Sequence, residues 1–282
     1  MAAANHVPGR TIGEATIPSI GLGTWRLNGR SGSEIVLAAL EVGYRHIDTA
    51  QMYDNESCVG AGLAASGVAR DDCWVTTKIN DENHRPDDMR RSFEQSLTDL
   101  RIDRVDLLLV HWPVCWETMA ETLAVLTEFA ADGRATHVGV SNFEVDQVQF
   151  AVEHAPVEVN QIEYHPLLGQ AGLLAQAEKL GLHVTAYCPI ARGLVLEDEA
   201  CVSVASKHGV TPAQAALAWV TSRSNVSAIP QTGKRERLVE NLEAAQVELD
   251  DGDIALIDAT HKNTRLVSPP KSPWRRPGHR RT

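Results

Sequence analysis

The most restrictive feature of the sequence is an alternation of short β-branched runs with segments of helical periodicity, which continues over nearly the whole chain. Residues 105–110, Val-Asp-Leu-Leu-Leu-Val, are nearly all apolar, as expected of a strand covered on both faces. Residues 31–42 place apolar side chains at a helical spacing, and Pro86 suits the first turn of a helix over 86–100. The strand-like runs are residues 16–25, 44–48, 73–78, 105–110, 136–140, 157–160, 182–186 and 226–229.

Strands that alternate with helices predict a closed parallel barrel rather than an open sheet, because the crossover helices keep each strand covered. We predict an α/β fold, a single (β/α)8 TIM barrel with a short N-terminal strand segment and an extended C-terminal tail. The length of 282 residues fits, since such barrels reach this size as one unit. The barrel domain is predicted over residues 1–268, with an extra helix at 211–219. Residues 269–282, rich in proline and arginine, are predicted to form a flexible tail.

The composition narrows the classes of partner. A net charge of −11 argues against nucleic acid, because neutralising phosphates needs a basic face. Five widely spaced cysteines without a Cys-x-x-Cys pair favour reduced thiols and no zinc site. Glu163 and His165 lack a third partner at ligand spacing, so we assign no metal. Without a signal-like or membrane-length apolar run, we expect a cytoplasmic monomer with no membrane partner.

Reactive side chains fall where the predicted strands end. These residues are Asp48, Lys78, His111, Asn142, Gln161 and Tyr187. In a parallel barrel, these strand ends form the face that carries active sites. Taken singly, Asp48 could cap a helix, Lys78 could be a solvated strand end, His111 a core histidine and Tyr53 loop packing. Because these four fall at successive strand-to-helix junctions, we expect them to converge.

Several motifs resemble those of the aldo-keto reductases, and within them the bacterial 2,5-diketo-D-gluconate and methylglyoxal reductases. The resemblance runs from about residue 17 to residue 269, nearly the whole chain. The motifs that carry it are Gly-Leu-Gly-Thr-Trp at 21–25, Gly-Tyr-Arg-His-Ile-Asp-Thr-Ala at 43–50, Tyr-Asp-Asn-Glu at 53–56, Val-Thr-Thr-Lys at 75–78, Val-Asp-Leu-Leu-Leu-Val-His-Trp-Pro at 105–113, Gly-Val-Ser-Asn-Phe at 139–143, Asn-Gln-Ile-Glu at 160–163 and Arg-Glu-Arg-Leu-Val-Glu-Asn at 235–241.

The resemblance implies an NADPH-dependent carbonyl reductase with Asp48, Tyr53, Lys78 and His111 as its catalytic tetrad. Negative charge develops on the carbonyl oxygen as hydride reaches the carbon, and it must be met by a proton. Tyr53 would be the acid. A tyrosine ordinarily titrates near pH 10, so Lys78 would ease its proton loss while Asp48 holds the ammonium in place. His111 would orient the substrate oxygen.

The same resemblance implies a cofactor site on the barrel, and no Gly-x-Gly-x-x-Gly fingerprint followed by an acid suggests a Rossmann domain instead. Ser141, Asn142 and Gln161 would bind the nicotinamide carboxamide and Tyr187 would stack on its ring. The other residues that the resemblance implies in cofactor binding are Thr24, Trp25, Gln231, Thr232, Lys234, Arg237 and Asn241. 

The sequence departs from the family at the expected pocket for the adenosine 2′-phosphate. Gln231-Thr232 replaces the usual Lys-Ser and removes one cation, although Lys234, Arg235 and Arg237 remain near by. Since a phosphate would still find charge-assisted donors there, we expect NADPH, with NADH as the alternative.

The substrate pocket is predicted to be shallow, because the connections after His111 and Tyr187 are short. Trp25, Tyr53, His111 and Trp112 are its candidate lining, although the two tryptophans could equally be barrel packing. Small aldehydes, α-oxoaldehydes and diketo sugar acids fit better than steroids. Residues 263–269 are a candidate cover for the mouth, and Arg265 within them is a candidate carboxylate ligand to which we do not commit. The alternatives are a non-catalytic NADPH-binding sensor or subunit, and an alcohol dehydrogenase that works mainly in the oxidative direction.

Overall fold

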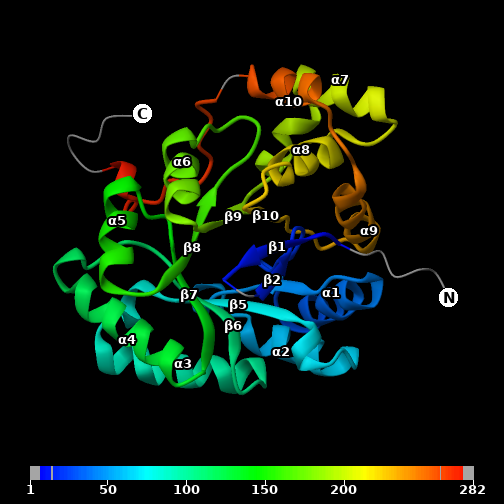
Figure 1. Cartoon of the computed structure of the whole chain (residues 1–282). Helices are drawn as coiled ribbons and strands as arrows, with labels where there is room; N and C mark the ends of the chain where they lie inside the picture. The colour runs from blue at the N-terminus through cyan, green and yellow to red at the C-terminus, as the bar shows by residue number, and fades with distance from the viewer. Residues whose placement is uncertain (1–6, 14, 261, 276–282) are drawn as a thin grey trace.

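A computed structural model describes residues 7–13, 15–260 and 262–275 of the chain (Figure 1). Eight parallel strands, β3 to β10, pair in sequence order, and helices surround them. Parallel bridges from Ile20 to Ala228 and from Gly23 to Gln231 join the first strand to the last. The predicted α/β barrel is therefore confirmed. The strands are β3 (Leu22–Gly23), β4 (His46–Asp48), β5 (Trp74–Ile79), β6 (Val105–Val110), β7 (Ala135–Ser141), β8 (Val157–Glu163), β9 (His183–Tyr187) and β10 (Val226–Ile229).

The helices cover the outside of the barrel, and those predicted over 31–42, 86–100 and 211–219 form close to these positions. The last helix before β10 begins after Thr211, whose hydroxyl accepts from the Gln214 backbone while Pro212 occupies the first turn. No helix of the described ranges is long and apolar enough to cross a membrane. The helices are α1 (Gly29–Val42), α2 (Glu56–Ser66), α3 (Pro86–Leu100), α4 (Met119–Ala131), α5 (Val145–His154), α6 (Ala171–Leu180), α7 (Glu199–His208), α8 (Pro212–Thr221), α9 (Arg235–Glu243) and α10 (Asp251–Asp258).

The first predicted strand, residues 16–25, is in fact two elements. Strand β2 (Ala15–Pro18) pairs antiparallel with β1 (Gly9–Ile12) in a hairpin, and only the two residues of β3 belong to the barrel. Ile12 and Ile17 of the hairpin pack against Trp74, the first residue of β5. Because this apolar cluster covers the amino-terminal end of the barrel, the opposite end is left for chemistry.

Two buried histidines in the strands give the fold a predicted dependence on pH. Burial lowers the pKa of both His46 and His183 to about 3. Between about pH 6.5 and pH 3 the unfolded chain therefore binds protons that the folded chain excludes. The free energy of unfolding should fall as the pH decreases through this range, by about 1.4 kcal/mol per pH unit for each histidine. Above the range both states leave the histidines neutral, so their burial costs no stability.

Urea unfolding at a series of pH values measures this slope directly. His183 Nε2 and the Ser227 hydroxyl form a hydrogen bond of 2.9 Å. A glutamine at position 183 could keep this bond, and its amide group does not titrate. We expect His183→Gln to have a shallower slope than the wild type. An unchanged slope would show that His183 is protonated equally in both states.

Candidate active site

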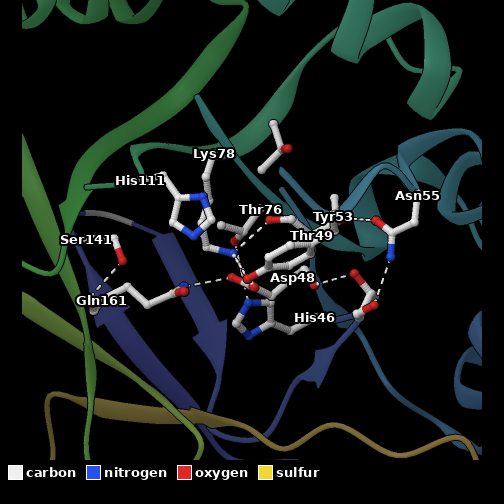
Figure 2. Close-up of polar contacts among 12 residues, drawn as sticks. His46, Asp48, Thr49, Tyr53, Asn55, Thr76, Lys78, His111, Ser141 and Gln161 are labelled. Carbon is white, nitrogen blue, oxygen red and sulfur yellow. Dashed lines mark hydrogen bonds and ion pairs between the residues drawn. The ribbon is translucent and has the colours of Figure 1, made fainter. Parts of the chain in front are cut away.

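A buried ion pair lies at the carboxyl ends of two neighbouring strands (Figure 2). Asp48 ends β4, and Lys78 lies near the end of β5, which pairs with β4 in parallel. The Lys78 Nζ donates to Asp48 Oδ1 at 2.5 Å and to the backbone oxygen of Thr49 at 2.7 Å. It also lies 3.5 Å from the Tyr53 hydroxyl. The ammonium is thus fixed by two acceptors and directed at the phenol.

Tyr53 comes from the short helix η1 (Gln51–Tyr53) that follows β4, and Asp54 ends this helix in the left-handed region with φ 52°. The tyrosine ring contacts Trp25 edge-on at 5.0 Å and His111 at 5.8 Å between ring centres. Three loops therefore contribute the aromatic groups that surround the phenol. The structure brings all four residues of the predicted tetrad together, as Figure 2 shows.

Burial dominates the electrostatics of the phenol. It raises the pKa of Tyr53, and the positive charge of Lys78 opposes it without reversing the direction. Burial also lowers the pKa of Lys78, but Asp48 and Tyr53 raise it by more, so the ammonium keeps its charge at neutral pH. The charge of Lys78 lowers the pKa of Tyr53, as expected of a cation that favours the phenolate. Burial raises this pKa by more, so Tyr53 stays protonated and available as an acid.

His111 follows directly after β6 and is also buried. Burial, and then the charge of Lys78, lower the pKa of His111 well below its ordinary value. The imidazole is therefore neutral at physiological pH and presents one N–H donor and one acceptor. A neutral donor beside the phenol can bind a carbonyl oxygen without competing with Tyr53 as the acid.

The residues predicted to bind the nicotinamide form one hydrogen-bonded edge. Tyr187, the last residue of β9, donates to Asn142 Oδ1 at 2.7 Å, and Asn142 adopts a φ of 64°. The Ser141 hydroxyl donates to the backbone oxygen of Gln161 at 2.9 Å. Gln161 Nε2 donates to Asp48 Oδ2 at 2.7 Å, so this edge is continuous with the ion pair.

The loop after β10 leads into the amino terminus of α9. Gln231 is exposed there and Thr232 is buried, and the Thr232 hydroxyl accepts from the Lys234 backbone at 3.1 Å. The Lys234 side chain is exposed. The amino terminus of a helix favours an anion, since its backbone N–H groups lack partners within the helix.

The basic residues of α9 differ in how free their charges are. Arg235 donates to Glu41 of α1 at 2.6 Å, so it is less available for a ligand than we predicted. Arg237 is exposed and makes no ion pair with a described residue. Asn241, one turn further along the helix, is buried. Thr24 follows β3 directly and is buried, and its hydroxyl donates to the backbone oxygen of Asp48 at 3.0 Å.

The segment after residue 262 crosses the mouth of the barrel. Glu163 at the end of β8 accepts from the backbone N–H groups of Leu266 at 2.7 Å and Val267 at 3.0 Å. Trp274 then packs on Trp112, which is buried, with 5.6 Å between ring centres. The predicted cover therefore extends through the tail as far as Arg275, and residues 276–282 lie outside the described residues.

Comparison with known proteins decides the family. The family model of the aldo/keto reductase family matches residues 19–262. The chain belongs to the aldo/keto reductase family. Methylglyoxal reductase DkgB of Escherichia coli O157:H7 is 42% identical over 258 residues, which cover 90% of this chain and 96% of that protein.

Two solved structures of this family are also similar. One carries the provisional name 2,5-diketo-D-gluconic acid reductase B, with 36% identity, a TM-score of 0.92, and coverage of 95% of this chain and 97% of that one. The other is an aldo-keto reductase of Bombyx mori in complex with NADP, with 29% identity, a TM-score of 0.86, and coverage of 95% and 96%. The protein is therefore an NAD(P)H-dependent oxidoreductase that reduces carbonyl groups of small molecules.

Three contacts of this aldo/keto reductase were missed by sequence reasoning. Gln161 donates to Asp48, a contact not implied by its predicted role in binding the nicotinamide. Asn55 Nδ2 donates to the backbone oxygens of Thr24 and Leu27. Trp274 packs on Trp112 and so forms part of the mouth. Each joins segments far apart in the sequence, so no local spacing indicates it.

Proposed function

We propose that this aldo/keto reductase uses NADPH to reduce small aldehydes, α-oxoaldehydes or diketo sugar acids, with Tyr53 as the proton donor. The observation that carries the proposal is the buried Lys78 ammonium, which contacts both Asp48 and the Tyr53 hydroxyl. The names of the DkgB relative and of the diketogluconate reductase structure support the substrate classes.

The residues of the chain supply positioning and a proton. A bound nicotinamide would provide the hydride, and the amides of Asn142 and Gln161 would hold its carboxamide. As the substrate oxygen gains negative charge, Tyr53 releases its proton to that oxygen. The Lys78 charge lies 3.5 Å from the phenol oxygen and stabilises the phenolate that forms. His111 directs the oxygen towards the phenol.

An absorbance assay tests this proposal. Wild-type protein mixed with methylglyoxal should oxidise NADPH, seen as loss of the absorbance of the reduced nicotinamide. The aldehyde panel should extend to a simple aromatic aldehyde and a diketo sugar acid. A protein that binds NADPH tightly but turns over none of these in either direction would instead be a non-catalytic sensor or subunit.

The preference for NADPH gives a prediction that compares two arginines of α9. Arg237 has no ion-pair partner among the described residues, whereas Arg235 pairs with Glu41. Arg237→Ala should raise the KM for NADPH about tenfold and leave the KM for NADH nearly unchanged, because a charge-assisted contact to the 2′-phosphate is lost. Arg235→Ala is the matched control on the same turn and should have a smaller effect. Equal losses with both coenzymes would contradict an assignment to the 2′-phosphate.

The remaining properties are also proposals. A cytoplasmic enzyme without nucleic-acid partners is supported by the net charge of −11 and by five free cysteines. A monomer without a membrane partner is proposed as well. We propose that residues 1–268 act as one catalytic unit. The contacts of Trp274 indicate that the following tail contributes to the mouth of that unit.

A further inference from the structure

The short helix that carries the proton donor has little of its own to hold it in place. Helix η1 is a single turn, in which the Tyr53 backbone N–H donates to the Ala50 oxygen at 3.0 Å. One turn of 3-10 helix is too short to be stable alone. The contact of the phenol with the Lys78 ammonium, at 3.5 Å, is too long to fix the ring firmly. Contacts of η1 with other segments must therefore set the distance between these two groups.

Gln51, the first residue of η1, makes such contacts through both ends of its side-chain amide. Its Oε1 accepts from the Asn80 backbone N–H at 2.8 Å and from Asn83 Nδ2 at 3.0 Å. Since a backbone N–H can only donate, the amide oxygen has to face Asn80, and the amide nitrogen points the other way. That nitrogen donates to the Ser96 hydroxyl at 3.0 Å. Gln51 thus joins η1 to the loop after β5 and to helix α3.

The same hydrogen-bond network continues to the strand that carries Lys78. The Ser96 hydroxyl donates to Oε2 of the buried Glu56 at 3.0 Å, and the Thr77 hydroxyl donates to Oε1 of the same carboxylate. Thr77 directly precedes Lys78 in the chain, and Asn80 follows Lys78 by two residues. The network therefore holds the chain on both sides of Lys78 while it holds η1.

We propose that Gln51 is a positioning residue, which sets the distance between the Tyr53 hydroxyl and the Lys78 ammonium. The inference rests on the proposed function, in which Tyr53 donates the proton. A shift of about 1 Å in a reacting group lowers a rate by about a hundredfold. The Gln51 amide also lines a polar cavity of about 270 Å³, where water can replace its hydrogen bonds. Because water does not tie η1 to a second segment, loss of the amide should affect catalysis more than stability.

The test is a double-mutant cycle with methylglyoxal and NADPH. Gln51→Met keeps the length of the side chain and removes the amide, and it should lower kcat about 10- to 100-fold, with the KM for methylglyoxal within about threefold. In the Tyr53→Phe background the same change should lower the residual kcat by less than about twofold, since the phenol that it displaces is absent. Gln95→Met serves as the control. Gln95 lines the same cavity but donates to Asp99, so this variant should keep the kcat of the wild type.

A loss of kcat that is equal with and without the phenol would overturn the inference, because it would indicate a general structural role. A Gln51→Met enzyme with the kcat of the wild type would overturn it as well. If Gln51→Met does not fold, as judged by NADPH binding, Asn83→Ala takes its place. This variant removes one of the two donors to Gln51 and should lower kcat about threefold, again only where Tyr53 is present. A wild type that reduces none of the carbonyl compounds, or a Tyr53→Phe variant as active as the wild type, instead contradicts the proposed function.

Discussion

Tyr53→Phe should lower kcat for carbonyl reduction by about a hundred- to ten-thousand-fold, which is the contribution expected of a positioned general acid. The phenol is the acidic group that contacts the Lys78 ammonium, and phenylalanine keeps its ring packing against Trp25 and His111. Binding of coenzyme should therefore change little. Single-turnover kinetics with methylglyoxal and NADPH would separate the chemical step from product release.

Tyr187→Phe is the matched control for this experiment. Tyr187 also lies in the site, but its hydroxyl donates to Asn142 rather than contacting Lys78. We expect this variant to keep kcat within about tenfold of the wild type, since one hydrogen bond is lost and the ring is kept. If Tyr53→Phe retained a comparable kcat, another group would have to supply the proton.

Lys78→Met should abolish most activity and also destabilise the fold, by about 3–5 kcal/mol. Both Lys78 and Asp48 are fully buried, and the Asp48 carboxylate would lose its cation. Gln161 would be left as its main side-chain donor. The phenolate would lose its stabilising charge at the same time, so kcat should fall at least as far as in Tyr53→Phe. Urea unfolding and steady-state assays measure the two effects separately.

The double variant Asp48→Asn/Lys78→Met tests the cause of the instability. Removing both charges leaves no unpaired ion, so the double variant should be more stable than Lys78→Met alone. Its activity should stay low, because the ammonium beside Tyr53 is still absent. A Lys78→Met variant as stable as the wild type, or a double variant no better than the single, would contradict this account.

Much of the barrel could be predicted because its signals are local. The all-apolar run at β6 and the proline that opens α3 fall in short windows, and both elements form where the pattern indicated. The N-terminal hairpin was missed, since a run with strand propensity does not reveal whether its partner is parallel or antiparallel. Only contact with Trp74 shows that the hairpin covers the barrel end.

For the candidate site, too, the sequence predicts some features, and others need the structure. The strand ends place Asp48, Lys78 and His111 on one face of any parallel barrel, so their convergence could be predicted before their distances were known. Two other contacts could not be predicted, because both join parts of the chain distant in sequence. They are the ion pair of Arg235 with Glu41 and the packing of Trp274 on Trp112. The net pKa of Tyr53 also needed the structure, since burial opposes the nearby charge.

By itself the sequence determined the barrel and which residues face its mouth, because both follow from periodicity and from the position of each residue along its strand. Tertiary structure decided which charges are free and which are paired. Gln161 was already predicted to be near the site, yet only its 2.7 Å bond shows that it holds Asp48. Burial and distance set the strength of electrostatic interactions, and both depend on segments that meet only when the chain folds.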